Sequence, residues 1–528
     1  MTTPIAAKIV TARTVRHPRW LYRLVPYAVY GVALWAFVGG SPYPLSDFPL
    51  DDAWIHRVYA SAFARGHGFQ YNPGGGQEAG STSPLWVLVS APAHWLEPFG
   101  PAAVVLGVKA TEVGLGVLVL NAIQQLGTEA MGTALGGTIA AALFAAEPRF
   151  LFSILSGMEN VLLLVVWAYG TCAFALRRRI RSLVWFSLAP VARPEALILL
   201  PLWLVGRWLL DRARRPTLAE HGAWLLAWAP VLLWGLFCRS VNGHWLPTTF
   251  YMKSRSFELG WPEVGVATDI IAQHGYAALP VFLFGLGVLV AWAVLDRRFE
   301  AAAMLWYLVL APLAYAVGVA GSRVLSPTGY YWTRWLDPAS LALEIGFCLA
   351  CGLAVAEATR VAAALRRGAR ARVPLPQWCL AGAGIAVAVW LALSTPRFAA
   401  SFVERRDRLV SDARAINLID VRAGQWIHDH TPATARVAVS DAGAIRYFGQ
   451  RWTLDLAGLN AADVAFGQRR IEPGDLDWLA VFPHFFPRPP AGFAPRQTIE
   501  IPFAEYTICP CPNQNRVDIY EYERPDGQ

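Results

Sequence analysis

Hydrophobic residues along this chain gather into long blocks that are separated by short polar segments. Most blocks approach the length of about 17–25 apolar residues with which a helix crosses the hydrocarbon core of a bilayer. The blocks predict eleven membrane-spanning helices, over 22–40, 101–123, 131–147, 157–176, 182–192, 194–210, 221–239, 275–295, 300–320, 335–358 and 376–394. This pattern is typical of a polytopic α-helical membrane protein.

Two parts of the apolar region depart from simple spans. The spans 182–192 and 194–210 are short, and Arg193-Pro194-Glu195 forms the tip between them. Interrupted helices are tolerated in a membrane where they are buried in protein or line a cavity. The segment 84–98 is apolar, but counting it as a span would place the arginines of 177–181 outside, so we expect it to be interfacial or re-entrant.

Arginine-rich segments beside the apolar blocks predict the orientation of the chain. They lie at 177–181, 207–215, 297–298 and 366–372, and an excess of Lys and Arg marks cytoplasmic loops. The N-terminus is then cytoplasmic, and an odd number of spans puts the C-terminal region outside. The net charge of +8 is explained by these loops, so no nucleic-acid partner is predicted. Hydrophobic residues make up 55% of the chain and charged residues 16%, which excludes an ordinary soluble protein.

The composition changes near residue 397, where charge and proline rise and no apolar block reaches spanning length. The stretch 404–430 has helical periodicity, and strand character occurs at 436–440, 478–482 and 517–520. The sequence therefore predicts two domains: a membrane module over 1–396 and an extracytoplasmic α/β domain over 397–528.

Asp51 and Asp52 lie in the predicted first outer loop, 41–84, just beyond the first apolar block. Adjacent carboxylates at the mouth of a membrane helix are costly without a partner. A carboxylate in this place can take a proton from a hydroxyl beside a lipid-borne substrate. The spacing after the pair predicts a short amphipathic helix along the membrane surface, with Arg57 and Arg65 away from its apolar face. A simpler interpretation is that one Asp caps this helix, and both interpretations can hold.

The same topology puts further charged residues on the outer side of the membrane: Glu159, Arg193, Glu195, Lys253, Arg255 and Arg334. Cations are normally depleted on that side. A phosphate or an anionic lipid headgroup would account for Lys253 and Arg255. The alternative is a pair of cations that snorkel to the interface.

A glycine-rich run between His67 and Glu78 lets the backbone approach a ligand closely. It matches neither a P-loop nor a dinucleotide fingerprint. No metal-ligand spacing appears in the chain, so no metal site is predicted. Cys509 and Cys511 have no second cysteine pair and are given no role.

Taken in order, several of these segments resemble the GT-C glycosyltransferases. The segments that carry the resemblance are Asp51-Asp52-Ala53, Gly66-His67-Gly68, Asn72-Pro73-Gly74, Glu78, Ser83-Pro84-Leu85-Trp86, Ser156-Gly157-Met158-Glu159, Ala192-Arg193-Pro194-Glu195, Leu246-Pro247-Thr248-Thr249-Phe250-Tyr251-Met252-Lys253, Arg334 with Pro338, Ser440-Asp441-Ala442-Gly443-Ala444 and Asp455-Leu456-Ala457-Gly458-Leu459. They run from about residue 47 to 460, and they are most similar to the branch that contains the mycobacterial terminal β-(1→2)-arabinofuranosyltransferase.

The resemblance implies a GT-C fold in a bacterial inner membrane, with its active site on the outer face. It implies an inverting transfer of a sugar, with arabinofuranose as one candidate, from a polyprenyl-phosphate donor to a cell-envelope glycan or lipid. Asp51 is the first choice for the general base and Asp52 the second. The donor-binding residues that it suggests are Lys253, Arg334, Arg193, Glu195, Glu159, His67 and Glu78. It implies no cofactor and leaves a divalent cation open.

Two other functions are compatible with the sequence. A transporter or a flippase of lipid-linked sugars would use Asp51, Glu159 and Arg193 along a translocation path, with charges spread through the depth of the bilayer. The charges here cluster at one face, and no internal repeat is evident, which favours an enzyme. A non-catalytic assembly subunit is the third possibility.

Overall fold

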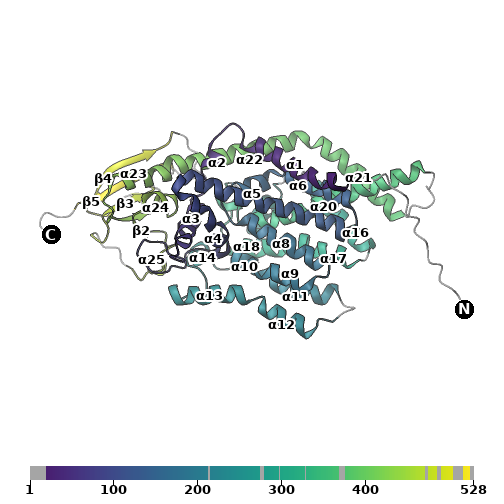
Figure 1. Ribbon diagram of the computed structural model, residues 1–528, viewed down its shortest axis with the longest axis horizontal. Helices are drawn as coiled ribbons and strands as arrows, with labels where there is room; N and C mark the ends of the chain where they lie inside the picture. The colour runs from purple at the N-terminus through teal and green to yellow at the C-terminus, as the bar shows by residue number, and fades with distance from the viewer. Residues whose placement is uncertain are drawn as a thin grey trace.

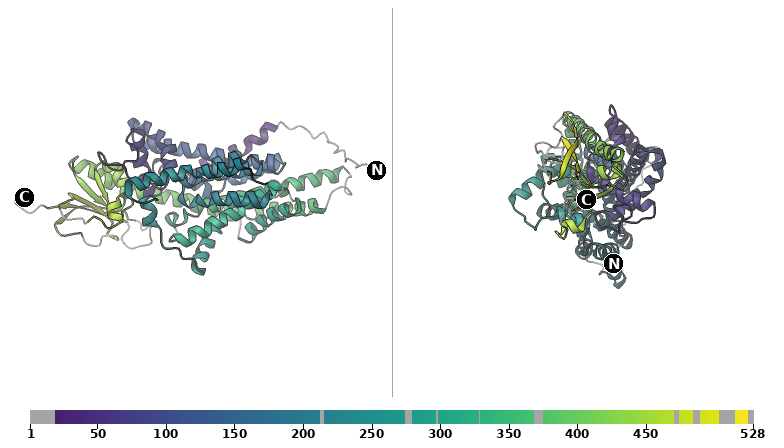
Figure 2. Two further views of the ribbon diagram at one scale, coloured as in Figure 1. Left: turned by 90° about the horizontal axis from the view of Figure 1, so that it is seen from below. Right: turned by 90° about the vertical axis from the view of Figure 1, so that its left-hand side faces the viewer.

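The helices form an elongated bundle with a small sheet at one end (Figure 1). The computed structural model describes residues 19–211, 215–273, 279–296, 298–327, 329–367, 375–469, 474–483, 489–502 and 515–523. A view along another axis shows the same division, with the strands at one end and the long helices running away from them (Figure 2). Cys509 and Cys511 lie outside the described residues.

The helices of the bundle are α1 (Arg19–Val38), α2 (Tyr43–Ser46), α3 (Asp51–Ala64), α4 (Pro84–Ser90), η1 (Ala91–Phe99), α5 (Pro101–Gln125), η2 (Leu126–Ala130), α6 (Ala134–Ala145), α7 (Pro148–Ile154), α8 (Asn160–Ala175), α9 (Arg179–Ser187), α10 (Ala189–Ala192), η3 (Pro194–Ile198), α11 (Leu199–Leu210), α12 (Leu218–Leu226), α13 (Ala229–Asn242), α14 (Thr248–Lys253), α15 (Trp261–Ile271), α16 (Leu279–Asp296), α17 (Phe299–Leu305), η4 (Trp306–Leu310), α18 (Ala311–Ser322), α19 (Tyr330–Thr333), α20 (Asp337–Arg366) and α21 (Leu375–Leu393). The helices that lead into the sheet are α22 (Thr395–Ile416), η6 (Asn417–Val421) and α23 (Arg422–His430).

Long apolar helices account for the membrane character of the bundle. By length and composition, four helical segments among the described residues can cross a membrane: Pro101–Ala130, Leu218–Asn242, Phe299–Ser322 and Asp337–Arg366. The number rises to as many as seven if each of three bent helix pairs counts as one span. The total of eleven spans stays a prediction.

Two of the apolar segments form short or bent helices instead of one straight helix. The span predicted over 131–147 is shorter than expected, because α6 ends at Ala145 and the chain bends by 66° into α7. Pro148 begins α7, which fits the preference of proline for a first helical turn. The segment 84–98, expected to be interfacial or re-entrant, forms the short helices α4 and η1.

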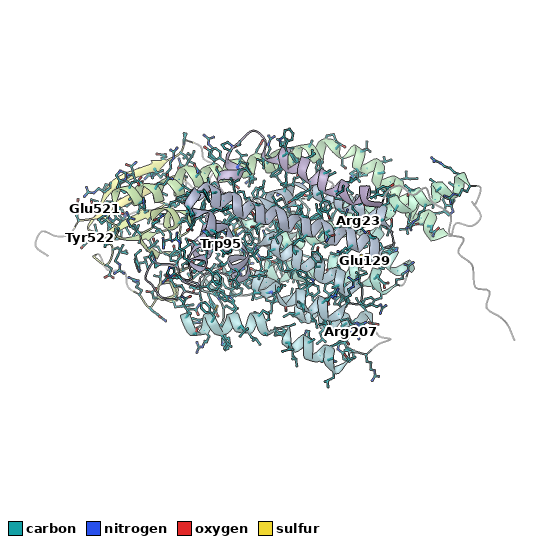
Figure 3. The ribbon with its side chains drawn as sticks, viewed as in Figure 1. Arg23, Trp95, Glu129, Arg207, Glu521 and Tyr522 are labelled. Atoms are coloured by element: carbon teal, nitrogen blue, oxygen red, sulfur yellow. The ribbon has the colours of Figure 1, made fainter. Side chains whose placement is uncertain are left out.

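Two of the arginines predicted to be cytoplasmic, Arg178 and Arg207, lie away from the sheet. Arg178 forms an ion pair with Glu129, with 3.2 Å between Nη2 and Oε2. Glu129 and Arg207 lie on the far side of the bundle from Glu521 and Tyr522 of the last strand (Figure 3). The orientation of the chain in the membrane stays a prediction.

The C-terminal part forms an α/β unit around a five-stranded sheet with the order β2-β1-β3-β5-β4. Its strands are β1 (Arg436–Val439), β2 (Trp452–Asp455), β3 (Trp478–Val481), β4 (Phe493–Glu500) and β5 (Arg516–Tyr522), and its short helices are α24 (Ala444–Gly449) and α25 (Ala462–Ala465). β1 runs parallel to β2 and β3, whereas β5 runs antiparallel to β3 and β4. The strands predicted at 436–440, 478–482 and 517–520 are confirmed, and β2 and β4 were not predicted.

The α/β unit docks on the loop that holds Asp51 and Asp52. Asn72 pairs with the backbone of Thr453 through two hydrogen bonds of 2.7 and 2.9 Å. The hydroxyl of Tyr71 donates to the carbonyl of Ala442 at 2.6 Å. Trp54 packs against two aromatic rings of α24. These contacts hold the carboxyl ends of the parallel strands against α3.

This docking overturns the expectation that the polar side chains of α3 face away from the protein, whereas its position on the membrane surface stays a prediction. Arg57 is fully buried, its Nη2 donates to Ser90 Oγ at 2.8 Å, and its guanidinium lies 5.4 Å from the ring of Trp86. The prediction was wrong because α4, η1 and α24 all pack against α3, so its polar side chains find partners inside the protein. Arg65, by contrast, is exposed and bonds to Glu97.

Candidate active site

A polar cavity lies where α3, α14 and the segments around residues 159, 194 and 323 meet. Its charged and titratable lining residues are Asp52, His56, Glu159, Arg193, Glu195, Lys253, Arg323 and Arg334. The cavity holds about 40 Å³, because these side chains bond to one another across it. All of them belong to segments that the sequence placed on one side of the membrane.

The first turn of α3 positions the two aspartates, but neither of them caps this helix. The N-cap residue is Leu50, and it makes no side-chain capping bond. Asp51 instead accepts hydrogen bonds from the backbone of Gly443 at 2.7 Å and Ala444 at 2.6 Å. These are the N-cap and first residue of α24, so Asp51 caps a helix of the α/β unit. The capping interpretation was therefore wrong about the helix that is capped.

The environment of Asp51 makes its carboxylate more basic than usual. Burial raises the pKa of Asp51 well above its ordinary value, and the nearby charges of Asp441 and Asp52 raise it further. The backbone N–H groups of Ala444 and Gly443 act in the opposite direction without cancelling the effect. A general base works best when its pKa lies near the operating pH, so Asp51 is suited to accept a proton.

Asp52 is held by two cations that come from distant segments. Lys253 Nζ lies 2.8 Å from both carboxylate oxygens, and Arg334 Nη2 lies 2.5 Å from Oδ2. Burial alone would raise the pKa of Asp52, but the charges of Lys253 and Arg334 outweigh it and lower the pKa well below its usual range. Asp52 is therefore a weak base that keeps two cations in place.

A chain of paired polar side chains continues from α3 across the cavity. His56 Nε2 lies 3.3 Å from Glu159 Oε2, and Glu159 Oε1 lies 2.8 Å from Arg193 Nη1. Arg193 Nε lies 3.6 Å from Glu195 Oε2, and Glu195 Oε1 lies 2.8 Å from Arg323 Nη2. All five side chains are at most 8% exposed. Buried charges are tolerated when they are paired in this way.

Asn160 joins the elements that carry these charges. Its Oδ1 accepts from Arg193 Nη1 at 2.5 Å. Its Nδ2 donates to the hydroxyl of Tyr330 at 3.3 Å and to the carbonyl of Arg334 at 3.4 Å. The start of α8, the tip at Arg193 and the turn before α20 are thus fixed relative to one another.

Most of the residues predicted for the site meet in this cavity: Asp52, Glu159, Arg193, Glu195, Lys253 and Arg334. Asp51, His67 and Glu78 do not, and Asp51 lines a neighbouring cavity together with Asp52 and Lys253. His67 is exposed and lines a different cavity, and Glu78 lies beside Asn72 and Asp463 in a third. Burial raises the pKa of Glu78 to about 8. Arg255 also lies elsewhere, with its Nη2 3.4 Å from Glu263 Oε1.

Two lining residues were not singled out from the sequence. Arg323 follows an apolar block in the predicted outer loop, so it carries the same signal as Lys253, a cation on the side where cations are rare. His56 lies four residues after Asp52, which puts both side chains on one face of α3. Among the described residues, no group of three or more His, Cys, Asp or Glu side chains could hold a metal ion.

Comparisons with known proteins identify the fold. The structure of ArnT from Cupriavidus metallidurans bound to undecaprenyl phosphate matches with a TM-score of 0.55 and 14% identity, over 96% of this chain and 99% of that chain. The archaeal oligosaccharyltransferase AglB from Archaeoglobus fulgidus, in complex with an inhibitory peptide and a dolichol-phosphate, matches with a TM-score of 0.52 and 13% identity, over 88% of this chain and 70% of that chain.

A sequence comparison adds a match to the C-terminal part. Residues 411–520 match a family described as a domain of unknown function (DUF8728). No curated protein matches the chain. The similarity to ArnT and to the oligosaccharyltransferase AglB extends over most of this chain, so the chain shares the fold of these structures.

Proposed function

We propose that this protein is a glycosyltransferase that moves a sugar from a polyprenyl-phosphate donor to a cell-envelope acceptor. The observation that carries the proposal is the arrangement of Asp52 beside Lys253, Arg334 and the paired charges of one cavity, with Asp51 next to it in the first turn of α3. Structures of the same fold bind undecaprenyl phosphate or a dolichol-phosphate. The orientation belongs to the proposal too, with the cavity on the outer face of a bacterial inner membrane.

Lys253 and Arg334 would receive the phosphate of the donor. Both cations bond to the Asp52 carboxylate, which, like the phosphodiester of the donor, carries one negative charge shared by two oxygens. A bound phosphate would compete with Asp52 for these donors, and its developing charge would be stabilised as the bond to the sugar breaks. Arg193 is the next cation along the cavity.

Asp51 would act as the general base, as the raised basicity of its carboxylate suggests. The acceptor hydroxyl gives its proton to Asp51 while its oxygen forms a new bond to the anomeric carbon. The bond between that carbon and the phosphate oxygen breaks, and its electron pair leaves with the polyprenyl phosphate. Attack on the face opposite the phosphate inverts the anomeric centre. Nearby carboxylates favour the oxocarbenium character that develops.

The proposal is tested with the purified full chain in lipid nanodiscs. A panel of polyprenyl-phosphate donors, including arabinofuranose and common hexoses, is added one at a time, and release of polyprenyl phosphate is measured. We expect one donor to be consumed well above the others. If no donor is consumed, and if donors instead move between the leaflets of protein-containing vesicles, a transporter would replace the enzyme.

The dependence of the reaction on pH follows from the proposed base. Asp51 must be deprotonated, and burial together with Asp441 raises its pKa. The rate should therefore rise with pH along an acidic limb whose midpoint lies above about 3.9, the ordinary value for an aspartate. Initial rates of donor consumption at saturating donor measure this limb. A midpoint at or below the ordinary value would contradict the assignment of Asp51.

A further inference from the structure

A second cavity adjoins the aspartate pair and shares lining residues with the first. It holds about 210 Å³, and its polar lining residues are Asp51, Asp52, Lys253, Tyr331, Ser440 and Asp441. Asp52 and Lys253 line both cavities. The start of α3 therefore stands between two polar spaces, as expected for a residue pair that acts between two substrates.

The α/β unit builds the far wall of this second cavity. Ser440 and Asp441 directly follow β1, and Ala457 and Leu459 follow β2. These are the carboxyl ends of neighbouring parallel strands, the edge at which open α/β sheets bind ligands. The unit thus directs toward Asp51 the edge that is best suited to binding.

The two cavities differ in charge. The first is lined by four cations, Arg193, Arg323, Lys253 and Arg334, against three carboxylates. The second has three carboxylates, Asp51, Asp52 and Asp441, against the single cation Lys253. A phosphate is attracted to the first cavity and repelled by the second. Sugar hydroxyls, which both donate and accept hydrogen bonds, suit the second.

Ser440 and Asp441 offer complementary groups to a hydroxyl-bearing ligand. Ser440 Oγ accepts from the backbone of Phe482 at 3.1 Å, which orients the hydroxyl to donate in turn. Asp441 is close enough to Asp51 for its charge to raise the pKa of that carboxyl. A hydroxyl between the two aspartates could donate to either of them.

We propose that Ser440 and Asp441, together with Asp51, form the subsite for the reacting hydroxyl of the acceptor, and that this acceptor is an uncharged saccharide. The inference rests on the proposed transfer reaction and adds the acceptor class to it. A volume of 210 Å³ is below the range of about 300–1,000 Å³ of pockets for drug-sized ligands, so the subsite suits one sugar ring. Asp441 also acts as a positioning residue, because its charge keeps Asp51 basic.

The test uses the full chain in nanodiscs with the donor that it consumes and a panel of n-octyl glycosides as acceptors. Asp441→Asn should raise the acceptor KM by about tenfold or more, and Ser440→Ala by about three- to tenfold. The donor KM should stay within about twofold in both variants. Asp429→Asn removes an exposed carboxylate from α23 of the same unit and should change neither constant.

A second readout separates a role in the reaction from a role in folding. The groups that act on Asp51 are Asp441, Asp52 and the N–H groups of Gly443 and Ala444, with Tyr71 also nearby. Removing the charge of Asp441 lowers the pKa of Asp51, so the acidic limb of donor hydrolysis by water should move to lower pH. If the acidic limb does not move in Asp441→Asn, or if the donor KM changes and the acceptor KM does not, the inference is overturned.

The remaining outcomes are also decisive. A wild-type protein that consumes no donor contradicts the proposed function, and the inference falls with it. A protein that hydrolyses the donor but accepts no glycoside keeps the proposed reaction and contradicts the saccharide acceptor. Ser440→Ala provides the kinetic test if thermal unfolding shows that Asp441→Asn does not fold.

Discussion

Sugar transfer is expected to fall by about 10²–10⁴-fold when Asp51 is replaced by Asn, the usual loss when a general base is removed. The amide of Asn cannot take the proton of the acceptor hydroxyl, so the loss should appear in kcat. The donor KM should change little, because the cations proposed for the phosphate bond to Asp52 and not to Asp51. Initial rates of polyprenyl-phosphate release measure both constants.

The contacts of Asp51 with the α/β unit require a check on folding. Both of its oxygens accept backbone N–H groups at the start of α24, and an Asn side chain can accept only one of these bonds through its single oxygen. Thermal unfolding in nanodiscs should therefore show a modest destabilisation with the fold retained. Asp429→Asn is the control for removing a carboxylate. Near-wild-type kcat in a folded Asp51→Asn protein would rule out Asp51 as the base and leave Asp52→Asn to be examined.

Lys253→Ala is expected to lower kcat/KM for the donor by about 10- to 150-fold. The estimate corresponds to the loss of a hydrogen bond to a charged group, about 1.5–3 kcal/mol. Lys253 donates to both oxygens of Asp52 and lies beside Tyr331, so its removal also leaves Asp52 with Arg334 as its remaining strong partner. Donor kinetics measured across a range of donor concentrations should show both a weaker donor interaction and slower departure of the phosphate.

Arg255→Ala is the matched control for this change, because Arg255 lies two residues further on and pairs with Glu263 outside the cavity. Arg334→Ala should resemble Lys253→Ala if the two cations act on the same phosphate. Unchanged donor kinetics in Lys253→Ala would contradict the assignment, and Arg193 would then be the cation to test.

Periodicity and composition were sufficient to predict the class of fold. In a membrane, a long apolar block satisfies its backbone hydrogen-bonding groups best as a helix. The alternating patterns after residue 397 identified three of the five strands. β2 and β4 were not predicted. A four-residue strand such as β2 is too short to show a clear alternation of apolar and polar residues, and β4 is largely exposed on one edge of the sheet.

The same kind of reasoning found most of the charged residues of the cavity. Asp52, Lys253 and Arg334 were identified because isolated charges at the outer ends of apolar blocks need partners. His67 and Glu78 were included through a local motif, but they line other cavities, since a motif does not specify where each of its residues points. Arg323 carried the same signal as Lys253, and it was missed because no motif surrounds it.

Local pattern determined that this chain forms apolar helices followed by an α/β unit, and that its unusual charges gather on one side. Periodicity reports which face of an element is buried, but not which distant segment covers it. Tertiary packing decided the rest: α4, η1 and α24 bury Arg57, and the α/β unit gives Asp51 the N–H groups of Gly443 and Ala444 as partners and brings Asp441 close to it. The contacts of Asp51 join residues almost 400 positions apart, and burial, Asp441 and the two cations on Asp52 together set the difference in basicity between two adjacent aspartates.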